Sequence, residues 1–173
     1  CTHIWNSSIS LLELMKKILV LFITAVLFSC TEDNTTVTRT KQEQLALDID
    51  RIKGYIEENN LSGFESLENG LHYKTLELGN QKYPEIGDTL SVEYVGQLLN
   101  GREFDRNYTN QPFELILGSG EVIQGWELGL PYVDEEGQIL LIIPSGLAYG
   151  NTSTNSIPEN SILIFRIKLL VIK

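Results

Sequence analysis

The chain has 173 residues, 42% of them hydrophobic and 21% charged, an ordinary globular composition with enough material for one core and some appendage. Its formal net charge is −10 and it has no basic stripe, which excludes nucleic acid as a partner because phosphate binding needs clustered Lys and Arg. Its two cysteines, Cys1 and Cys30, lie outside the part expected to fold, which excludes a disulfide framework and a cysteine-based metal site.

The N-terminal stretch has the pattern of an export signal. From Met15 the sequence gives a basic start, an apolar run over 18–28 and then Cys30, and residues 1–14 are expected to be upstream read-through. The apolar run is shorter than the roughly 20 residues that a membrane-spanning helix needs, so a permanent transmembrane segment is the weaker interpretation. We predict a signal peptide over residues 15–29.

The signal ends in Leu27-Phe28-Ser29-Cys30, which resembles a bacterial lipobox, in which the cysteine is acylated. The alternative is a chance cysteine beside an ordinary cleavage site, but Cys30 is the sole thiol after the leader, which favours lipidation. Residues 30–40 are polar and are expected to form a flexible tether. We therefore expect a protein of the Gram-negative cell envelope, periplasmic or on the outer-membrane surface, that touches the membrane only through its lipid.

An amphipathic helix is predicted at the start of an extension over 41–69. Residues 41–60 carry an apolar stripe at four-three-four spacing with charged residues on the other faces, a pattern that Gly54 weakens modestly. The stripe could pack on its own domain or pair with a second copy of the chain. Packing on the domain is the commoner outcome, so a monomer is expected ahead of a dimer. The stripe consists of Leu45, Ile49, Ile52 and Ile56.

From residue 70 onward the pattern is that of strands. Alternating apolar residues or short apolar runs predict strands over 71–78, 89–98, 112–117, 138–143 and 161–172. Asn100-Gly101 is a strong hairpin signal and predicts one more short strand at 102–105. Residues 122–130 place four apolar side chains at helical spacing. The predicted class is α+β, with an antiparallel sheet of five or six strands around one short helix.

Side chains for covalent or metal chemistry are scarce. His72 lies on a predicted strand without a triad partner and is expected to be a surface or edge residue. Gly118-Ser119-Gly120 lacks the frame of a nucleophile elbow and the lysine of a phosphate loop, so it is interpreted as a tight turn. Asp134-Glu135-Glu136 is interpreted as a charged turn. No metal and no cofactor are expected.

What remains is a set of aromatic residues on separate elements, which alone would usually indicate a core. Five segments around them resemble the FKBP-type prolyl isomerases in order and spacing, over residues 70–173. Their joint occurrence is more specific than any one of them, although Arg106 and Asn107 stand where the family often has serines. The segments are VEYVG at 92–96, GREFD at 101–105, VIQGWELGL at 122–130, IPSGLAYG at 143–150 and IPENS at 157–161.

The resemblance implies a half-barrel sheet with an apolar pocket that binds proline-containing polypeptides and is open to macrolide-type inhibitors. It places the proline ring over Trp126, one substrate carbonyl at the backbone N–H of Ile123 and another at the hydroxyl of Tyr149. Asp105 is implied next to the rotating carbonyl, where it directs that carbonyl or bonds a neighbouring hydroxyl. The implied walls are Tyr94, Phe104, Phe113, Val122, Ile123, Ile157 and Phe165.

The favoured function is therefore a peptidyl-prolyl cis/trans isomerase that assists the folding of exported or envelope proteins. Two other functions stay open. A non-catalytic chaperone would hold proline segments in the same pocket without turnover. A structural envelope lipoprotein would use the aromatic residues only as core and its acidic surface for contacts with other proteins.

Overall fold

The structure is a computed structural model of the chain, which describes residues 39–107 and 111–173. The predicted leader, the lipobox cysteine Cys30 and most of the predicted tether lie outside the described residues. Within these two ranges, no helix is long and apolar enough to cross a membrane.

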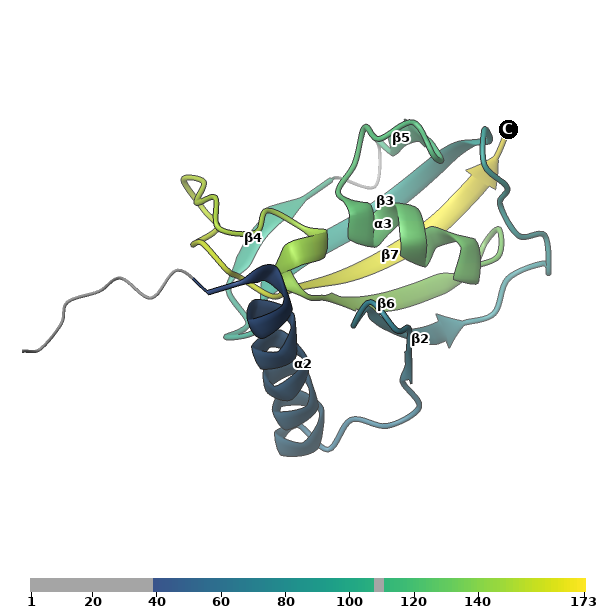
Figure 1. The fold of residues 1–173 in the computed structure, drawn as a ribbon. Coiled ribbons are helices and arrows are strands. Elements are labelled where there is room, and N and C mark those ends of the chain that lie inside the picture. Colours follow the sequence, from purple (N-terminus) through teal and green to yellow (C-terminus); the bar gives the residue numbers. More distant parts are fainter. Residues whose placement is uncertain (1–38, 108–110) are drawn as a thin grey trace, which may run out of the picture. The chain divides into compact units, whose positions relative to one another are not determined.

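The described part is built on one antiparallel sheet of seven strands (Figure 1). The strand order is β1-β2-β6-β7-β3-β4, and β5 pairs with β3. The predicted α+β class and antiparallel sheet are confirmed, and the count exceeds six because β1 has only two residues, too few for an alternating pattern. The strands are β1 (Glu65–Ser66), β2 (His72–Glu77), β3 (Thr89–Leu98), β4 (Glu103–Arg106), β5 (Phe113–Ile116), β6 (Gln138–Ile143) and β7 (Leu163–Ile172).

The central strands match the predicted bounds best. β3 and β6 begin and end where the apolar patterns place them, and β3 pairs with β7 from Leu90 to Leu98. The predicted hairpin is present: Gly101 has a φ of 81° and its N–H donates to the carbonyl of Leu98 at 2.9 Å. β7 starts two residues later than predicted, because Ser161 still belongs to a turn in which its hydroxyl donates to the carbonyl of Pro158 at 2.7 Å.

One face of the sheet is covered by the short helix α3 (Gln124–Gly129), which continues into the 3-10 helix η1 (Leu130–Tyr132). Two glycines bring the α3 backbone close to β6. A Cβ added at Gly125 would lie 2.4 Å from Cγ2 of Ile143, and one added at Gly129 would lie 2.7 Å from Cδ1 of Leu141. Side chains of ordinary size at these positions would hold the helix off the sheet.

Part of the other face is covered by helix α2 (Lys41–Glu58), which begins with a capping box. Ile52 of the predicted stripe packs with Ile142 and Ile164, which alternate along their strands with the residues that face α3. The helix therefore packs on its own sheet. Asp48 is also buried on this helix, although it lies outside the predicted apolar stripe.

Candidate functional site

Aromatic side chains from four elements meet around Trp126 of α3. The ring of Trp126 lies 5.0 Å from that of Tyr94 and 5.2 Å from that of Phe165, measured between centroids, and both pairs are nearly perpendicular. Phe113 lies 6.2 Å from Trp126, and Phe104 reaches the cluster through Phe165 at 5.5 Å. Such edge-to-face pairs are a favoured arrangement of aromatic rings. Residues that are up to 71 positions apart, from 94 to 165, are thus brought together.

A glycine in the middle of β3 makes room for this cluster. A Cβ added at Gly96 would lie 2.7 Å from Cζ of Phe104 and 2.8 Å from Cε1 of Phe165. Real Cβ atoms do not approach other atoms so closely, so a larger residue would displace one of the two rings. The sequence signal was a glycine inside an otherwise regular strand pattern, which is typical of a close approach.

The cluster has a buried floor and an exposed rim. Trp126, Ile157 and Phe165 are 3%, 4% and 5% exposed, whereas Phe113 is 38% exposed. Tyr149 is 42% exposed and lies near enough to Tyr94 to raise the pKa of that phenol. The other predicted wall residues are half-buried and pack against the same core: Tyr94, Phe104, Val122 and Ile123.

Tyr94 and Asp105 form the polar edge of the cluster. The hydroxyl of Tyr94 donates to Oδ2 of the exposed Asp105 at 2.9 Å. Burial, together with this hydrogen bond and the nearby carboxylate, raises the pKa of Tyr94 to about 12, and Tyr149 contributes in the same direction. Tyr94 is therefore a protonated donor at neutral pH. Of the two implied roles for Asp105, bonding to a neighbouring hydroxyl is the contact present here.

Asn107 holds the backbone of Tyr94 in place. Its side-chain Oδ1 accepts from the N–H of Tyr94 at 2.6 Å, and its Nδ2 donates to the carbonyl of Val92 at 3.0 Å. The amide side chain thus continues the ladder of β3 beyond the end of β4. From the sequence, Asn107 was noted only as a departure from the family pattern, and this contact was not predicted.

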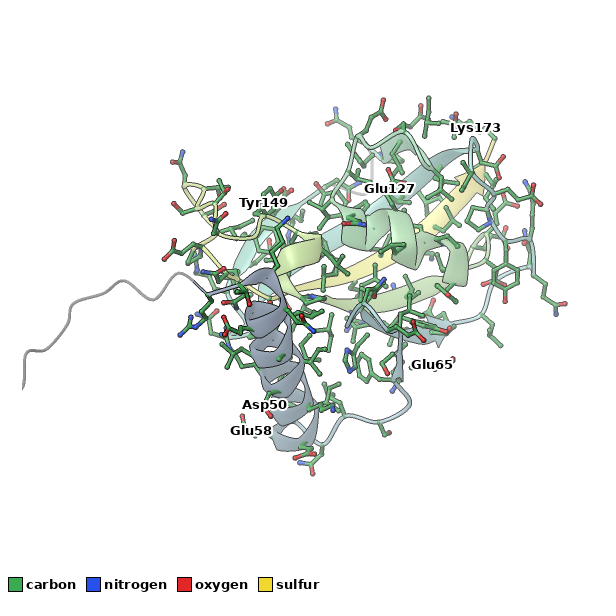
Figure 2. All side chains as sticks on the ribbon, viewed as in Figure 1. Asp50, Glu58, Glu65, Glu127, Tyr149 and Lys173 are labelled. Carbon is green, nitrogen blue, oxygen red and sulfur yellow. The ribbon has the colours of Figure 1, made fainter. Side chains whose placement is uncertain are left out.

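The loop before α3 is held by the helix itself. The carboxylate of Glu127 accepts from the N–H groups of Gly118 at 2.6 Å and Gly120 at 3.0 Å (Glu127 is labelled in Figure 2). Both glycines have a positive φ, so the predicted tight turn at 118–120 is confirmed. The turn leads into Ile123, whose extended backbone starts α3.

Two donors at the cluster have no acceptor among the residues that the structure describes. The buried indole N–H of Trp126 has no hydrogen-bond partner there. The backbone carbonyl of Ile123 accepts from Trp126 at 2.9 Å, while no described group accepts from the N–H of Ile123. Unpaired donors beside an apolar surface are available to a polar group of a ligand.

Two polar residues outside the cluster are more buried than expected. His72 is 7% exposed, with Nδ1 2.9 Å from the carbonyl of Gly70, so its predicted surface or edge position is wrong. Asp134 is 1% exposed and accepts from the N–H groups of Gly79 and Gln81, which makes the charged turn an anchor for the loop after β2. No group of three His, Cys, Asp or Glu side chains that could hold a metal ion occurs in residues 39–107 and 111–173.

A groove of about 610 Å³ lies apart from the cluster, between α2 and the segment before β7. None of the predicted site residues lines it, and no aromatic ring does, whereas arginine, glutamate and amide side chains contribute to its lining. The aromatic cluster is therefore the candidate site. The groove is lined by Arg39, Gln44, Leu47, Arg51, Leu98, Leu99, Asn100, Pro158, Glu159, Asn160, Ser161 and Ile162.

Comparison with known proteins agrees with the predicted family. Residues 80–170 match the family model described as FKBP-type peptidyl-prolyl cis-trans isomerase. "FK506-binding protein 4" of Chaetomium thermophilum is 47% identical over 96 residues, which are 56% of this chain and 20% of that protein. "FKBP-type peptidyl-prolyl cis-trans isomerase FkpA" of Escherichia coli is 40% identical over 112 residues, 64% of this chain and 41% of that protein. The chain thus spans well under half the length of these curated relatives.

Solved structures share the fold. The crystal structure of FkpA from Escherichia coli superposes with a TM-score of 0.64 at 33% identity, covering 97% of this chain and 75% of that one. A peptidyl-prolyl cis-trans isomerase from Pseudomonas syringae pv. tomato gives a TM-score of 0.62 at 26% identity, covering 78% of this chain and 97% of that one.

Proposed function

Because this chain belongs to the FKBP-type peptidyl-prolyl cis-trans isomerase family, we propose that it catalyses rotation about X-Pro peptide bonds at the aromatic cluster around Trp126. The observation that carries this proposal is the convergence of Tyr94, Phe113 and Phe165 on Trp126. The substrates are proline-containing polypeptides, and the isomerase domain comprises residues 70–173. Macrolide-type inhibitors would compete for the same apolar surface.

Catalysis of this rotation requires no broken covalent bond. The barrier of about 18–20 kcal/mol comes from amide resonance, which is lost when the peptide bond twists. Resonance also places negative charge on the carbonyl oxygen, so the planar amide is more polar than the twisted one. Excluding water therefore raises the free energy of the planar form more than that of the twisted form. An apolar site thus lowers the barrier.

Three contacts orient the substrate in this proposal. The proline ring lies on the face of Trp126, which gains apolar contact without needing a charged partner. The N–H of Ile123 donates to one substrate carbonyl, a role supported by its lack of an acceptor among the described residues. The hydroxyl of Tyr149, on a side chain that is 42% exposed, donates to a second carbonyl. Fixing one side of the chain lets the other side rotate.

Asp105 acts on the reaction through the phenol of Tyr94 in this proposal. Its carboxylate fixes the hydroxyl of Tyr94 at 2.9 Å, and that ring in turn contacts Trp126. A direct action on the rotating carbonyl is the alternative that the resemblance leaves open. The two roles predict different effects of Tyr94→Phe. A role through the phenol would be lost with that hydroxyl, whereas a direct role of Asp105 would remain.

The deciding experiment measures interconversion of a short X-Pro peptide by NMR exchange, with and without the protein. We expect faster exchange with the wild type, and at least a tenfold loss in Phe113→Ala, because a rim ring that helps to exclude water is removed. Tyr83→Ala is the matched control, since Tyr83 is also an exposed aromatic, at 51%, and lies outside the cluster. Unchanged exchange with the wild type would refute the isomerase.

Binding without faster exchange would instead support a chaperone that holds proline segments. Neither binding nor exchange would favour a structural envelope protein whose aromatic residues are only core. Both results can be read from the same NMR samples, through shifts of the peptide resonances. The three functions are therefore separated by one titration.

The site of action follows from the N-terminal sequence. We propose that residues 15–29 direct export, that Cys30 is acylated and that residues 30–40 tether the domain to an envelope membrane, where the clients are exported or envelope proteins. Support comes from the lipobox resemblance of Leu27-Phe28-Ser29-Cys30. Metabolic labelling with a radioactive fatty acid should mark the wild type and not Cys30→Ala. Labelling that persists in Cys30→Ala would contradict the anchor.

A further inference from the structure

A carboxylate on the N-terminal helix is buried where α2 meets the segment that carries Tyr149. Asp48 is fully buried, and Ser145, its neighbour across the contact, is fully buried as well. Ser145 starts the short 3-10 helix η2 (Ser145–Leu147), and Tyr149 follows two residues later (Figure 2). Helix α2, which the sequence placed in an extension before the isomerase domain, therefore contacts a loop of the proposed site.

Three donors converge on the Asp48 carboxylate. Its Oδ2 accepts from the backbone N–H of Ser145 at 2.8 Å and from the Ser145 hydroxyl at 2.6 Å. Its Oδ1 accepts from Nε2 of Gln44 at 2.8 Å. Two short hydrogen bonds to one carboxyl oxygen, one from the backbone and one from the side chain, therefore fix Ser145 to α2.

Ser145 in turn holds the backbone on both sides of Tyr149. Its carbonyl accepts from the N–H of Ala148 at 3.0 Å and from the N–H of Gly150 at 2.8 Å. Gly150 has a φ of 58°, and its carbonyl accepts from the N–H of Asn160 at 2.6 Å. A continuous set of hydrogen bonds therefore runs from Asp48 to the residues that flank the exposed Tyr149 side chain.

Helix packing alone gives no reason for this carboxylate. Ile52 and the isoleucines beneath it already attach α2 to the sheet. Burying a polar group among apolar residues is costly, and an apolar side chain of similar volume often packs as well or better. The carboxylate does what an apolar side chain could not do, which is to fix a backbone N–H and a hydroxyl in one orientation.

We infer that Asp48 is a positioning residue for Tyr149, acting through Ser145, so that α2 is part of the isomerase site. This inference rests on the proposed function, in which the Tyr149 hydroxyl binds a substrate carbonyl. Loss of the Asp48 contact would leave Tyr149 on a loop with a weaker attachment. Misplacement of a substrate-binding group by about 1 Å can cost up to 100-fold in rate.

The test compares Asp48→Ala with Asp50→Ala in the full chain, because Asp50 is exposed on the same helix (Figure 2). Alanine at position 48 removes both oxygens that accept from Ser145 and Gln44. We expect kcat/KM for an X-Pro peptide to fall about 10- to 100-fold in Asp48→Ala, as for a displaced binding group, and to stay unchanged in Asp50→Ala. Unchanged kcat/KM in folded Asp48→Ala would overturn the inference.

Tyr149→Phe separates positioning from general loosening. If Asp48 acts through the Tyr149 hydroxyl, Asp48→Ala should cost little more once that hydroxyl is absent, because coupled residues are not additive. Independent losses that multiply would overturn the inference. Where Asp48→Ala folds poorly, Ser145→Ala replaces it, since that variant keeps the backbone N–H bond to Asp48 and removes only the hydroxyl.

Amide hydrogen exchange gives a readout that does not need turnover. Exchange at Ala148 and Gly150 should accelerate in Asp48→Ala and not in Asp50→Ala, because their acceptor is the carbonyl of Ser145. If the wild type shows no isomerase activity, the proposed function fails while this exchange result still tests the link. Equal protection in both variants would refute the link even in an active enzyme.

Discussion

The two faces of the sheet are packed with different kinds of side chain. Under α3, aromatic rings pack edge to face around Trp126, and Phe113 at the rim is 38% exposed. The indole N–H of Trp126 has no acceptor among the residues that the structure describes. Under α2, Ile52 packs on Ile142 and Ile164 in an aliphatic layer. Both layers pack on the same sheet. Of the two, only the layer under α3 combines an apolar surface with exposed side chains and with N–H groups that have no acceptor among the described residues. Substitutions in either layer should therefore lower stability, whereas only substitutions under α3 should also lower activity.

The largest expected effect comes from truncating one large side chain on each face. Trp126→Ala should lower the free energy of unfolding by about 3–5 kcal/mol and Ile142→Ala by about 2–5 kcal/mol, because both leave cavities. Only Trp126→Ala should also abolish isomerisation, measured per folded molecule, since Ile142 lies on the far face. Chemical denaturation and peptide exchange by NMR check the two quantities. An inactive but folded Ile142→Ala protein would break the distinction between the faces.

Next comes a pair of glycine substitutions, one in each helix. Gly125→Ala should destabilise the protein by about 1–3 kcal/mol, because its Cβ would overlap Ile143 and push α3 off the sheet. Gly54→Ala in α2 should stabilise it by about 0.5–1 kcal/mol, because nothing lies within 4 Å of that Cβ and alanine favours the helix. Equal thermal shifts of one sign in both variants would show that α3 does not need its close approach.

A smaller effect is expected at the polar edge of the aromatic face. Tyr94→Phe removes a hydrogen bond to Asp105 and should cost about 0.5–1.5 kcal/mol of stability. If Asp105 acts only through that phenol, Asp105→Ala and Tyr94→Phe should reduce kcat/KM equally, and the double variant should match either one. A greater loss in Asp105→Ala than in Tyr94→Phe would instead assign the carboxylate a direct role on the rotating carbonyl.

The sequence predicts the aliphatic layers better than the aromatic site. Alternation gives the bounds of β3 and β6 because each strand has two distinct faces, and the apolar stripe of α2 points to its packing. Asp48 was missed because a buried carboxylate looks like any polar helix residue until its partner Ser145, 97 positions away, is in place. Periodicity predicts only that the aromatic residues are core, and the family resemblance is what indicated a pocket with Trp126 as its floor; the burial of Phe165 and Ile157, expected as walls, follows only from the structure.

The close approach of side chains to the backbone at glycines was the other feature that the sequence did not fully predict. Gly96, Gly125 and Gly129 carry no side chain to form a pattern, yet each makes room for a neighbour that arrives from a distant part of the chain. The short strand β1 and the Asn107 contact with Tyr94 likewise depend on tertiary neighbours rather than local sequence. A glycine within a strand pattern, as at Gly96, indicates a close approach, but which side chain fills the space is known only from the fold.

The smallest expected effect on the aromatic face appears in alkaline solution. The pKa of Tyr94 is raised from its ordinary value of 10.0 to about 12, so its protonated form contributes stability that is complete below pH 10 and is lost as the pH rises through about 12. The stability difference between wild type and Tyr94→Phe should therefore be constant up to pH 10 and shrink above it. Chemical denaturation at a series of pH values measures this difference, with Tyr83→Phe as the exposed-phenol control. A difference that grew with pH would mean that the Tyr94 hydroxyl is stabilised as the phenolate, which the neighbouring Asp105 carboxylate opposes.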